Sequence, residues 1–201
     1  MRGRVLPDCG GGVEPGGAGK LRVVSNLATI VIDMLNPYDH EDGEELAAQV
    51  PDRIEPLKAL IGATPDAGAH LVYVNDNFED FTATSKDIGE AAMNGRHPEL
   101  VEPLLPPKGA LFVLKVRHSA FYSTALDHLL RTHDVRTVVL AGQVTEQCIL
   151  YSALDAYVRG FEVRVARDAV VPLDPELGEA ALTMMERNMR ARVVPGGEAF
   201  D

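Results

Sequence analysis

Apolar residues occur along the chain in short continuous runs that alternate with longer segments of mixed character. Six of these runs are rich in β-branched and other apolar residues, which is the pattern of strands buried on both faces. They cover residues 27–35, 70–76, 110–115, 136–142, 161–168 and 191–195. The pattern therefore predicts six strands that expose little surface to solvent.

Between these runs, apolar residues recur at the three- and four-residue spacing of amphipathic helices. The predicted helices cover residues 43–63, 119–133, 145–160 and 175–190, whereas residues 77–109 are polar and offer at most a short helix. Continuous apolar strands alternating with helices indicate an α/β fold, with a parallel sheet covered on both faces. In a doubly wound sheet of this kind, ligands bind at the carboxyl ends of the strands, near the point where the strand order reverses.

Composition and charge narrow the class of protein. A chain of 201 residues with 46% hydrophobic residues is long enough for one core, so we expect one domain. The formal charge of −11 disfavours nucleic acid and anionic membrane surfaces as partners. No window has the roughly 18 consecutive apolar residues of a membrane helix, and no signal-peptide core is present, so we expect a cytoplasmic protein.

Residues 1–24 differ from the rest of the chain. This segment is dense in glycine and lacks apolar periodicity, which predicts a mobile tail followed by one domain over residues 25–201. One of the two cysteines, Cys9, lies in the tail, and we expect it to be inert. The other, Cys148, is judged by its own surroundings.

Three chemically active side chains stand at the ends of predicted strands. Asp33 and Lys115 each follow a run of apolar residues, and Cys148 comes shortly after the strand that ends near Gly142. A carboxylate in such a position is costly unless it is paired, and one ammonium can compensate it. A purely structural ion pair, or two side chains that reach solvent, is the competing interpretation for Asp33 and Lys115.

The position of Cys148 favours a reaction centre. Thr145 is a suitable N-cap residue, which would place Cys148 in the first turn of a helix, with a buried apolar stripe behind it: Ile149, Leu150, Ala153, Leu154, Tyr157 and Val158. A helix N-terminus and the Lys115 ammonium both favour a thiolate and would lower the pKa of the thiol. Asp33 could accept the thiol proton and later activate water. A small buried core cysteine is the alternative.

These residues resemble the motifs of the isochorismatase-like cysteine hydrolases. "VIDMLNPY" is similar to the family's aspartate motif, "LKVRHSAF" to its lysine motif, and "LAGQVTEQCILYSALDAYVRGFEV" to its nucleophile segment. The resemblance covers roughly residues 26–194. It implies a Rossmann-like sheet of about six strands and a catalytic triad of Asp33, Lys115 and Cys148 that hydrolyses a C–N bond through a thioester.

The resemblance also implies details of the site. It places a cis peptide bond between Gln143 and Val144, and it assigns the oxyanion hole to the backbone N–H groups of Val144 and Cys148. It implies a homo-oligomer, as a dimer or tetramer, and a reaction without a cofactor. Family nicotinamidases hold a metal with an aspartate and two histidines after the second strand, but "NDNFEDF" here has no histidine, so we expect no metal.

Substrate-binding residues are expected around the strand ends. Leu35 replaces a glutamine common in the family, and Asn36 is the candidate to take over its contact. Arg117 or His118 could turn toward an anionic substrate group, and surface charge beside a helix cap at Ser119 is the competing interpretation for both. Core packing or solvent exposure is the competing interpretation for the remaining candidates, Asn75, Asn77, Phe78, Phe121 and Tyr151.

The leading hypothesis is a hydrolase that acts on a small amide, carbamoyl or ureido substrate through Cys148. A second hypothesis is isochorismatase-type vinyl-ether hydrolysis, in which Asp33 would be the acid and no cysteine would be required. A third is a non-catalytic member of the fold that binds a ligand or a partner. The intact triad favours the first hypothesis. It does not distinguish amide, carbamoyl and ureido substrates from one another.

Overall fold

The computed structural model describes residues 26–201; the predicted tail and Cys9 lie outside the described residues. Six parallel strands form one sheet in the order β3-β2-β1-β4-β5-β6. The strands are β1 (Leu27–Ile32), β2 (His70–Asp76), β3 (Leu111–Lys115), β4 (Thr137–Gln143), β5 (Glu162–Val171) and β6 (Arg192–Val194). The predicted doubly wound α/β fold is confirmed, and its strand order reverses between β1 and β4.

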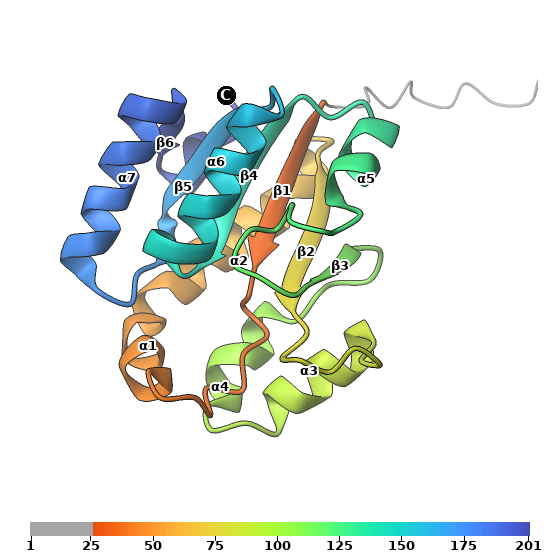
Figure 1. The fold of residues 1–201 in the computed structure, drawn as a ribbon, viewed down its shortest axis with the longest axis vertical. Coiled ribbons are helices and arrows are strands. Elements are labelled where there is room, and N and C mark those ends of the chain that lie inside the picture. Colours follow the sequence, from red (N-terminus) through yellow and green to blue (C-terminus); the bar gives the residue numbers. More distant parts are fainter. Residues whose placement is uncertain (1–25) are drawn as a thin grey trace, which may run out of the picture.

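Helices cover both faces of this sheet (Figure 1). They are α1 (Gly43–Gln49), α2 (Pro51–Asp66), α3 (Ser85–Met93), α4 (Pro98–Val101), α5 (Leu126–Thr132), α6 (Leu150–Val158) and α7 (Pro175–Met189). In Figure 1, α5, α6 and α7 lie in front of the sheet and α2 lies behind it. Of the helices that the structure describes, none is both long and apolar enough to cross a membrane.

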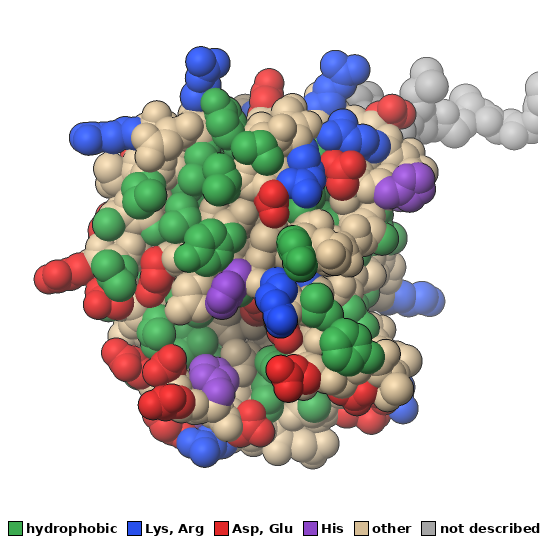
Figure 2. Space-filling model, in the orientation of Figure 1, with side chains coloured by type: hydrophobic (Ala, Val, Ile, Leu, Met, Phe, Trp, Pro, Cys, Tyr) green, Lys and Arg blue, Asp and Glu red, His purple; other side chains and the backbone are tan. Residues whose placement is uncertain are grey.

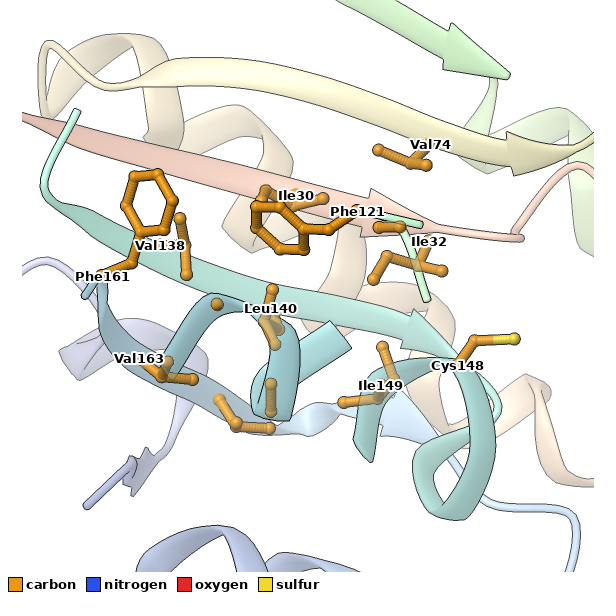
Figure 3. Packing of buried hydrophobic residues seen from close by; sticks show 14 of the residues in the cluster. Ile30, Ile32, Val74, Phe121, Val138, Leu140, Cys148, Ile149, Phe161 and Val163 are labelled. Carbon is orange, nitrogen blue, oxygen red and sulfur yellow. The ribbon is translucent and has the colours of Figure 1, made fainter. Parts of the chain in front are cut away.

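Strand periodicity divides the core into two apolar layers. Ile30 and Ile32 point to the layer shared with α5, α6 and α7, whereas Val31 points to the layer shared with α1 and α2. All three side chains are fully buried. Figure 3 shows Ile30 and Ile32 in the first layer, with Cys148 at the end of the same layer. The nucleophile candidate therefore lies where the core meets the carboxyl ends of the strands.

The predicted segment boundaries need two corrections near the N-terminal half of the sheet. The first strand ends at Ile32 rather than at residue 35, because Asp33 has a φ of 55° and leaves the extended conformation. The helix predicted over residues 43–63 is two helices that meet at Val50. Pro51 begins the second of these, where its missing N–H group costs no helical hydrogen bond.

Residues 77–109 contain more helix than the single short one predicted. They form α3, α4 and a short 3₁₀ turn at Glu102–Leu104. Thr84 and Asp87 form a reciprocal capping box at the start of α3. The polar residues of this segment are thus helix caps as well as loop residues.

The helix predicted over residues 119–133 is only half as long, because α5 begins at Leu126. Before Leu126, two side chains form hydrogen bonds with backbone groups. Ser119 Oγ accepts the Phe121 N–H group at 3.2 Å, and Thr124 Oγ1 donates to the Ala120 carbonyl at 2.6 Å. Such side-chain bonds compete with helical bonds and favour turns. The segment between Lys115 and α5 is therefore a loop that runs over the edge of the sheet.

The segment predicted as one helix over residues 145–160 begins with a π-helical turn, Thr145–Ile149, before α6. Its N-cap is Val144, not Thr145, and no side-chain cap bond forms there. The wider turn changes the rotation of the residues that follow. As a result the predicted buried stripe is only partly correct: Ile149 and Ala153 are buried and Leu150 is half-buried against the core, whereas three large side chains of α6 remain exposed, namely Leu154, Tyr157 and Val158.

Candidate active site

The structure brings the three predicted catalytic side chains together at the carboxyl ends of the strands. Lys115 Nζ lies 2.8 Å from Asp33 Oδ2 and 3.8 Å from Cys148 Sγ. All three residues are less than 10% exposed, although Asp33, Lys115 and Cys148 come from segments far apart in the sequence. Their place, where the strand order reverses, is where doubly wound sheets bind ligands. Their catalytic roles stay a prediction that rests on this geometry.

Asp33 is fixed by bonds to both neighbouring strands. Its carboxylate accepts the Asp76 N–H group at 2.8 Å through Oδ1, while its own N–H group donates to the Val74 carbonyl at 2.9 Å. The Gln143 side chain donates to the Asp33 carbonyl at 2.7 Å. Burial raises the pKa of the Asp33 carboxyl above its usual range, although Lys115 opposes this shift. The carboxyl is thereby both rigidly held and suited to accept a proton.

Lys115 lies between two carboxylates. Its ammonium is 3.3 Å from Asp76 Oδ2 in addition to its contact with Asp33. Burial lowers the pKa of Lys115, but Asp33, Cys148 and Asp76 outweigh burial and raise that pKa above its usual value. Lys115 therefore remains charged. Sequence reasoning did not assign Asp76 a role, although its position at the end of β2 is a signal that could have identified it.

The pKa of the Cys148 thiol is raised, whereas the sequence pattern predicts that it is lowered. Burial, followed by the charge of Asp33, raises the pKa of the Cys148 thiol far above its usual value, while Lys115 and a hydrogen bond from the Val144 N–H group lower it. The expected net lowering is wrong, because the apolar layer behind Cys148 and the nearby carboxylate outweigh the ammonium. The resting group is a thiol hydrogen-bonded to Asp33. Asp33 is therefore placed to take the proton as the sulfur attacks.

The backbone before Cys148 is held by close packing of β4 against β1. Gly142 has a φ of +108°, and a Cβ atom there would lie 2.1 Å from the Ile32 carbonyl oxygen, so only glycine fits. The following bond, Gln143–Val144, is cis, as the resemblance implied. The Val144 N–H group contacts Cys148 Sγ, which places one of the two predicted oxyanion donors beside the nucleophile.

Two hollows, both lined by His118, open beside the triad. Figure 2 shows one face of the molecule, which is hollowed near its middle. One has a volume of about 470 Å³, and its lining includes Asp76, Asn77 and Phe81. The other has a volume of about 390 Å³, and its lining includes Tyr151 and Tyr122. Arg117 and His118 line both hollows. Of the predicted substrate-binding residues, Asn77, Arg117 and Tyr151 therefore reach a hollow.

The structure places the other four candidates differently. Phe121 is buried in the core, 5.8 Å from the ring of Phe161, and Figure 3 shows it beside Ile30. Asn75 is buried and bonds the backbone of Leu35 through both ends of its amide. Asn75 thus holds the turn after β1, Phe121 packs in the core, and neither side chain lines a hollow.

Asn36 and Phe78 also lie outside the lining of the two hollows. Asn36 Oδ1 accepts the Tyr38 N–H group at 2.8 Å, so this side chain closes the turn after β1. Phe78 is 42% exposed and has a φ of 50°, whereas Phe81 takes the place in the hollow that was expected for it.

One contact at the nucleophile was not anticipated. His118 Nδ1 lies 3.7 Å from Cys148 Sγ, and the imidazole ring is 5.5 Å from the ring of Tyr151. From the sequence, His118 is only an alternative to Arg117 for binding an anion. Its proximity to Cys148 depends on the path of the loop after β3, which periodicity does not predict.

Within residues 26–201, no group of three histidine, cysteine, aspartate or glutamate side chains is arranged to hold a metal ion. Asp76, the acidic residue at the end of β2, is bonded to Lys115 and to the Phe78 N–H group. The residues present therefore do not match the aspartate and two histidines that the resemblance associates with a nicotinamidase metal site.

Comparison with known proteins identifies the relatives of this chain. The Isochorismatase domain model matches residues 27–195. An uncharacterized isochorismatase family protein, YaaI of Bacillus subtilis, is 30% identical and aligns over 84% of this chain and 93% of its own length. The ureidoacrylate amidohydrolase RutB of Rhizobium rhizogenes is 27% identical, over 78% of this chain and 75% of its own length.

A solved structure shows the same relationship. The nicotinamidase PncA of Bacillus subtilis superposes with a TM-score of 0.65 at 28% identity, covering 85% of this chain and 99% of that chain. The family model spans more than half of the chain, and the six-stranded parallel sheet agrees with the fold that the resemblance implies. The chain belongs to the isochorismatase family and is an enzyme of the hydrolase type found in that family.

Proposed function

We propose that this enzyme hydrolyses a C–N bond in a small amide, carbamoyl or ureido substrate through a thioester on Cys148. The observation that carries the proposal is the placement of the Lys115 ammonium 2.8 Å from Asp33 and 3.8 Å from Cys148 Sγ. Two hollows lie next to this cluster, because both are lined by His118, which contacts Cys148. Matched relatives named as amidohydrolases support the same class of reaction.

In the first half of the reaction, Cys148 Sγ attacks the substrate carbonyl carbon and Asp33 takes the thiol proton. The carbonyl π pair moves to oxygen, and the backbone N–H groups of Val144 and Cys148 stabilise this oxyanion. Lys115 stays charged throughout and offsets the negative charge that passes between carboxylate, sulfur and oxygen. The tetrahedral intermediate collapses, Asp33 returns its proton to the leaving nitrogen, and the C–N bond breaks. Ammonia or an amine departs and leaves a thioester on Cys148.

The position of Arg117 supports a substrate that carries a negative charge. Its exposed guanidinium lines both hollows, where it is placed to bind a carboxylate carried by the substrate at a distance from the scissile bond. We therefore propose that acidic amides and ureides are better substrates than neutral ones.

The test is a screen of purified protein for ammonia release from small amides, carbamoyl compounds and ureides, each as an acidic and a neutral member. We expect turnover of at least one compound, a loss of about 10⁴-fold or more in Cys148→Ala, and full activity in Cys9→Ala. Turnover retained in Cys148→Ala would contradict a covalent thiol mechanism. Absence of turnover across the whole panel would favour vinyl-ether hydrolysis or a ligand-binding member of the fold.

A further inference from the structure

The nucleophile has a second proton-accepting neighbour besides Asp33. Cys148 Sγ is hydrogen-bonded to the carboxylate of Asp33 and also lies 3.7 Å from Nδ1 of His118. An imidazole is the side chain most often used for proton transfer near neutral pH. With two such groups next to one sulfur, each can serve as the base in one of the two half-reactions.

The two groups differ in their exposure to solvent. Asp33 is 9% exposed and is held with Lys115 at the ends of the buried strands, whereas His118 is exposed and lines both hollows. Both hollows are lined by His118, which contacts Cys148, so a water molecule that enters from either hollow meets His118 next to the sulfur.

The hydrogen bonds of Asp33 also make it less available than His118 to bind the attacking water. Its Oδ1 atom accepts the Asp76 N–H group at 2.8 Å, and its Oδ2 atom accepts from Lys115 at 2.8 Å. A water molecule would have to compete with both donors. His118 Nδ1, by contrast, faces the sulfur itself, and the ring is supported by its contact with Tyr151.

We propose that His118 is a catalytic residue for the second half of the reaction, the hydrolysis of the thioester; this inference rests on the proposed function. With its proton on Nε2, the neutral imidazole takes a proton from water through Nδ1 while the water oxygen bonds to the thioester carbonyl carbon. The resulting tetrahedral intermediate expels sulfur as the C–S bond breaks. The electron pair leaves with Sγ, which takes the proton from Nδ1. The products are the free acid and the Cys148 thiol.

The test separates this step from the choice of natural substrate by using p-nitrophenyl acetate. The ester acetylates Cys148 with release of p-nitrophenolate, and mass spectrometry then follows the hydrolysis of acetyl-Cys148, with Cys148→Ala as the correction for other sites. We expect hydrolysis to be about 100-fold slower in His118→Ala and in His118→Gln, while the acetylation rate changes by less than about threefold. Added imidazole should restore part of the rate in His118→Ala, because the position is open to solvent.

The matched control is His128→Ala, which removes another exposed histidine, on α5. It should hydrolyse acetyl-Cys148 at the wild-type rate and show no response to imidazole beyond that of wild type. Equal hydrolysis rates in wild type and both His118 variants would overturn the proposal, as would failure of the ester to acetylate Cys148. A panel of amides without turnover, combined with slow hydrolysis only in the His118 variants, would instead reject the proposed substrate class and keep the role of His118.

Discussion

At the residue scale, Cys148 lies near the Lys115 ammonium and the Asp33 carboxylate, which shift the pKa of its thiol in opposite directions. Burial and, after it, the charge of Asp33 raise the pKa of the thiol, and Lys115 lowers it. A cysteine outside this environment has a pKa of about 8.5. The reactive thiolate is thus formed during the attack, when the proton passes to Asp33, and is not present at rest.

This arrangement predicts how alkylation of Cys148 depends on pH. In a Cys9→Ala background, the rate of reaction with iodoacetamide should be low at pH 7, with an inflection above the ordinary thiol range. Asp33→Asn removes the negative charge and should move the inflection downward, whereas Lys115→Ala removes the opposing positive charge and should move it upward. A wild-type inflection below pH 8 would show that the ammonium outweighs burial and would contradict this account.

At the element scale, the end of β4 determines where the nucleophile stands. Gly142 packs directly on β1, and the π-helical turn at Thr145–Ile149 then carries Cys148 toward Lys115. Glycine is required by the contact with the Ile32 carbonyl as well as by a positive φ. The close packing of β4 against β1 at Gly142 is therefore needed to place Cys148 next to Lys115.

We expect Gly142→Ala to lower the free energy of unfolding by about 3 kcal/mol or more, because backbone strain and a clash with β1 add together. Gly109→Ala is the matched control: Gly109 also has a positive φ, +94°, but a Cβ atom there would meet nothing within 4 Å. Strain alone should cost about 1 kcal/mol there. Urea unfolding of both variants measures the difference, and equal losses would show that the contact with Ile32 is unimportant.

At the scale of the whole molecule, large apolar side chains remain on the surface. Tyr151, Leu154, Tyr157 and Val158 are all more than one third exposed, and they follow one another along α6, in front of the sheet in Figure 1. Contiguous exposed apolar surface of this kind commonly marks an interaction site. This agrees with the homo-oligomer expected from the family resemblance, which stays a prediction.

Light scattering of the eluting peak in size-exclusion chromatography tests that prediction. With 21.7 kDa per chain, the particle mass should correspond to a dimer or a tetramer. Because burial of apolar area drives such association, the mass should persist in high salt. A single-chain mass at micromolar and higher protein concentrations would contradict it.

Local sequence patterns were sufficient to predict the α/β class, four strands to within one residue, and the placement of Asp33, Lys115 and Cys148 at one edge of the sheet. The predicted ends of β1 and β5 each differ from the structure by three residues. Local patterns suffice because apolar runs define strands, and polar residues that follow these runs lie at the same edge of a parallel sheet. Other features depend on contacts between distant segments: the break at Val50, the π-helical turn, the burial of Phe121 and the contact of His118 with Cys148. The direction of the thiol pKa shift is of this second kind, since burial and charge at the sulfur come from residues that only the folded chain brings together.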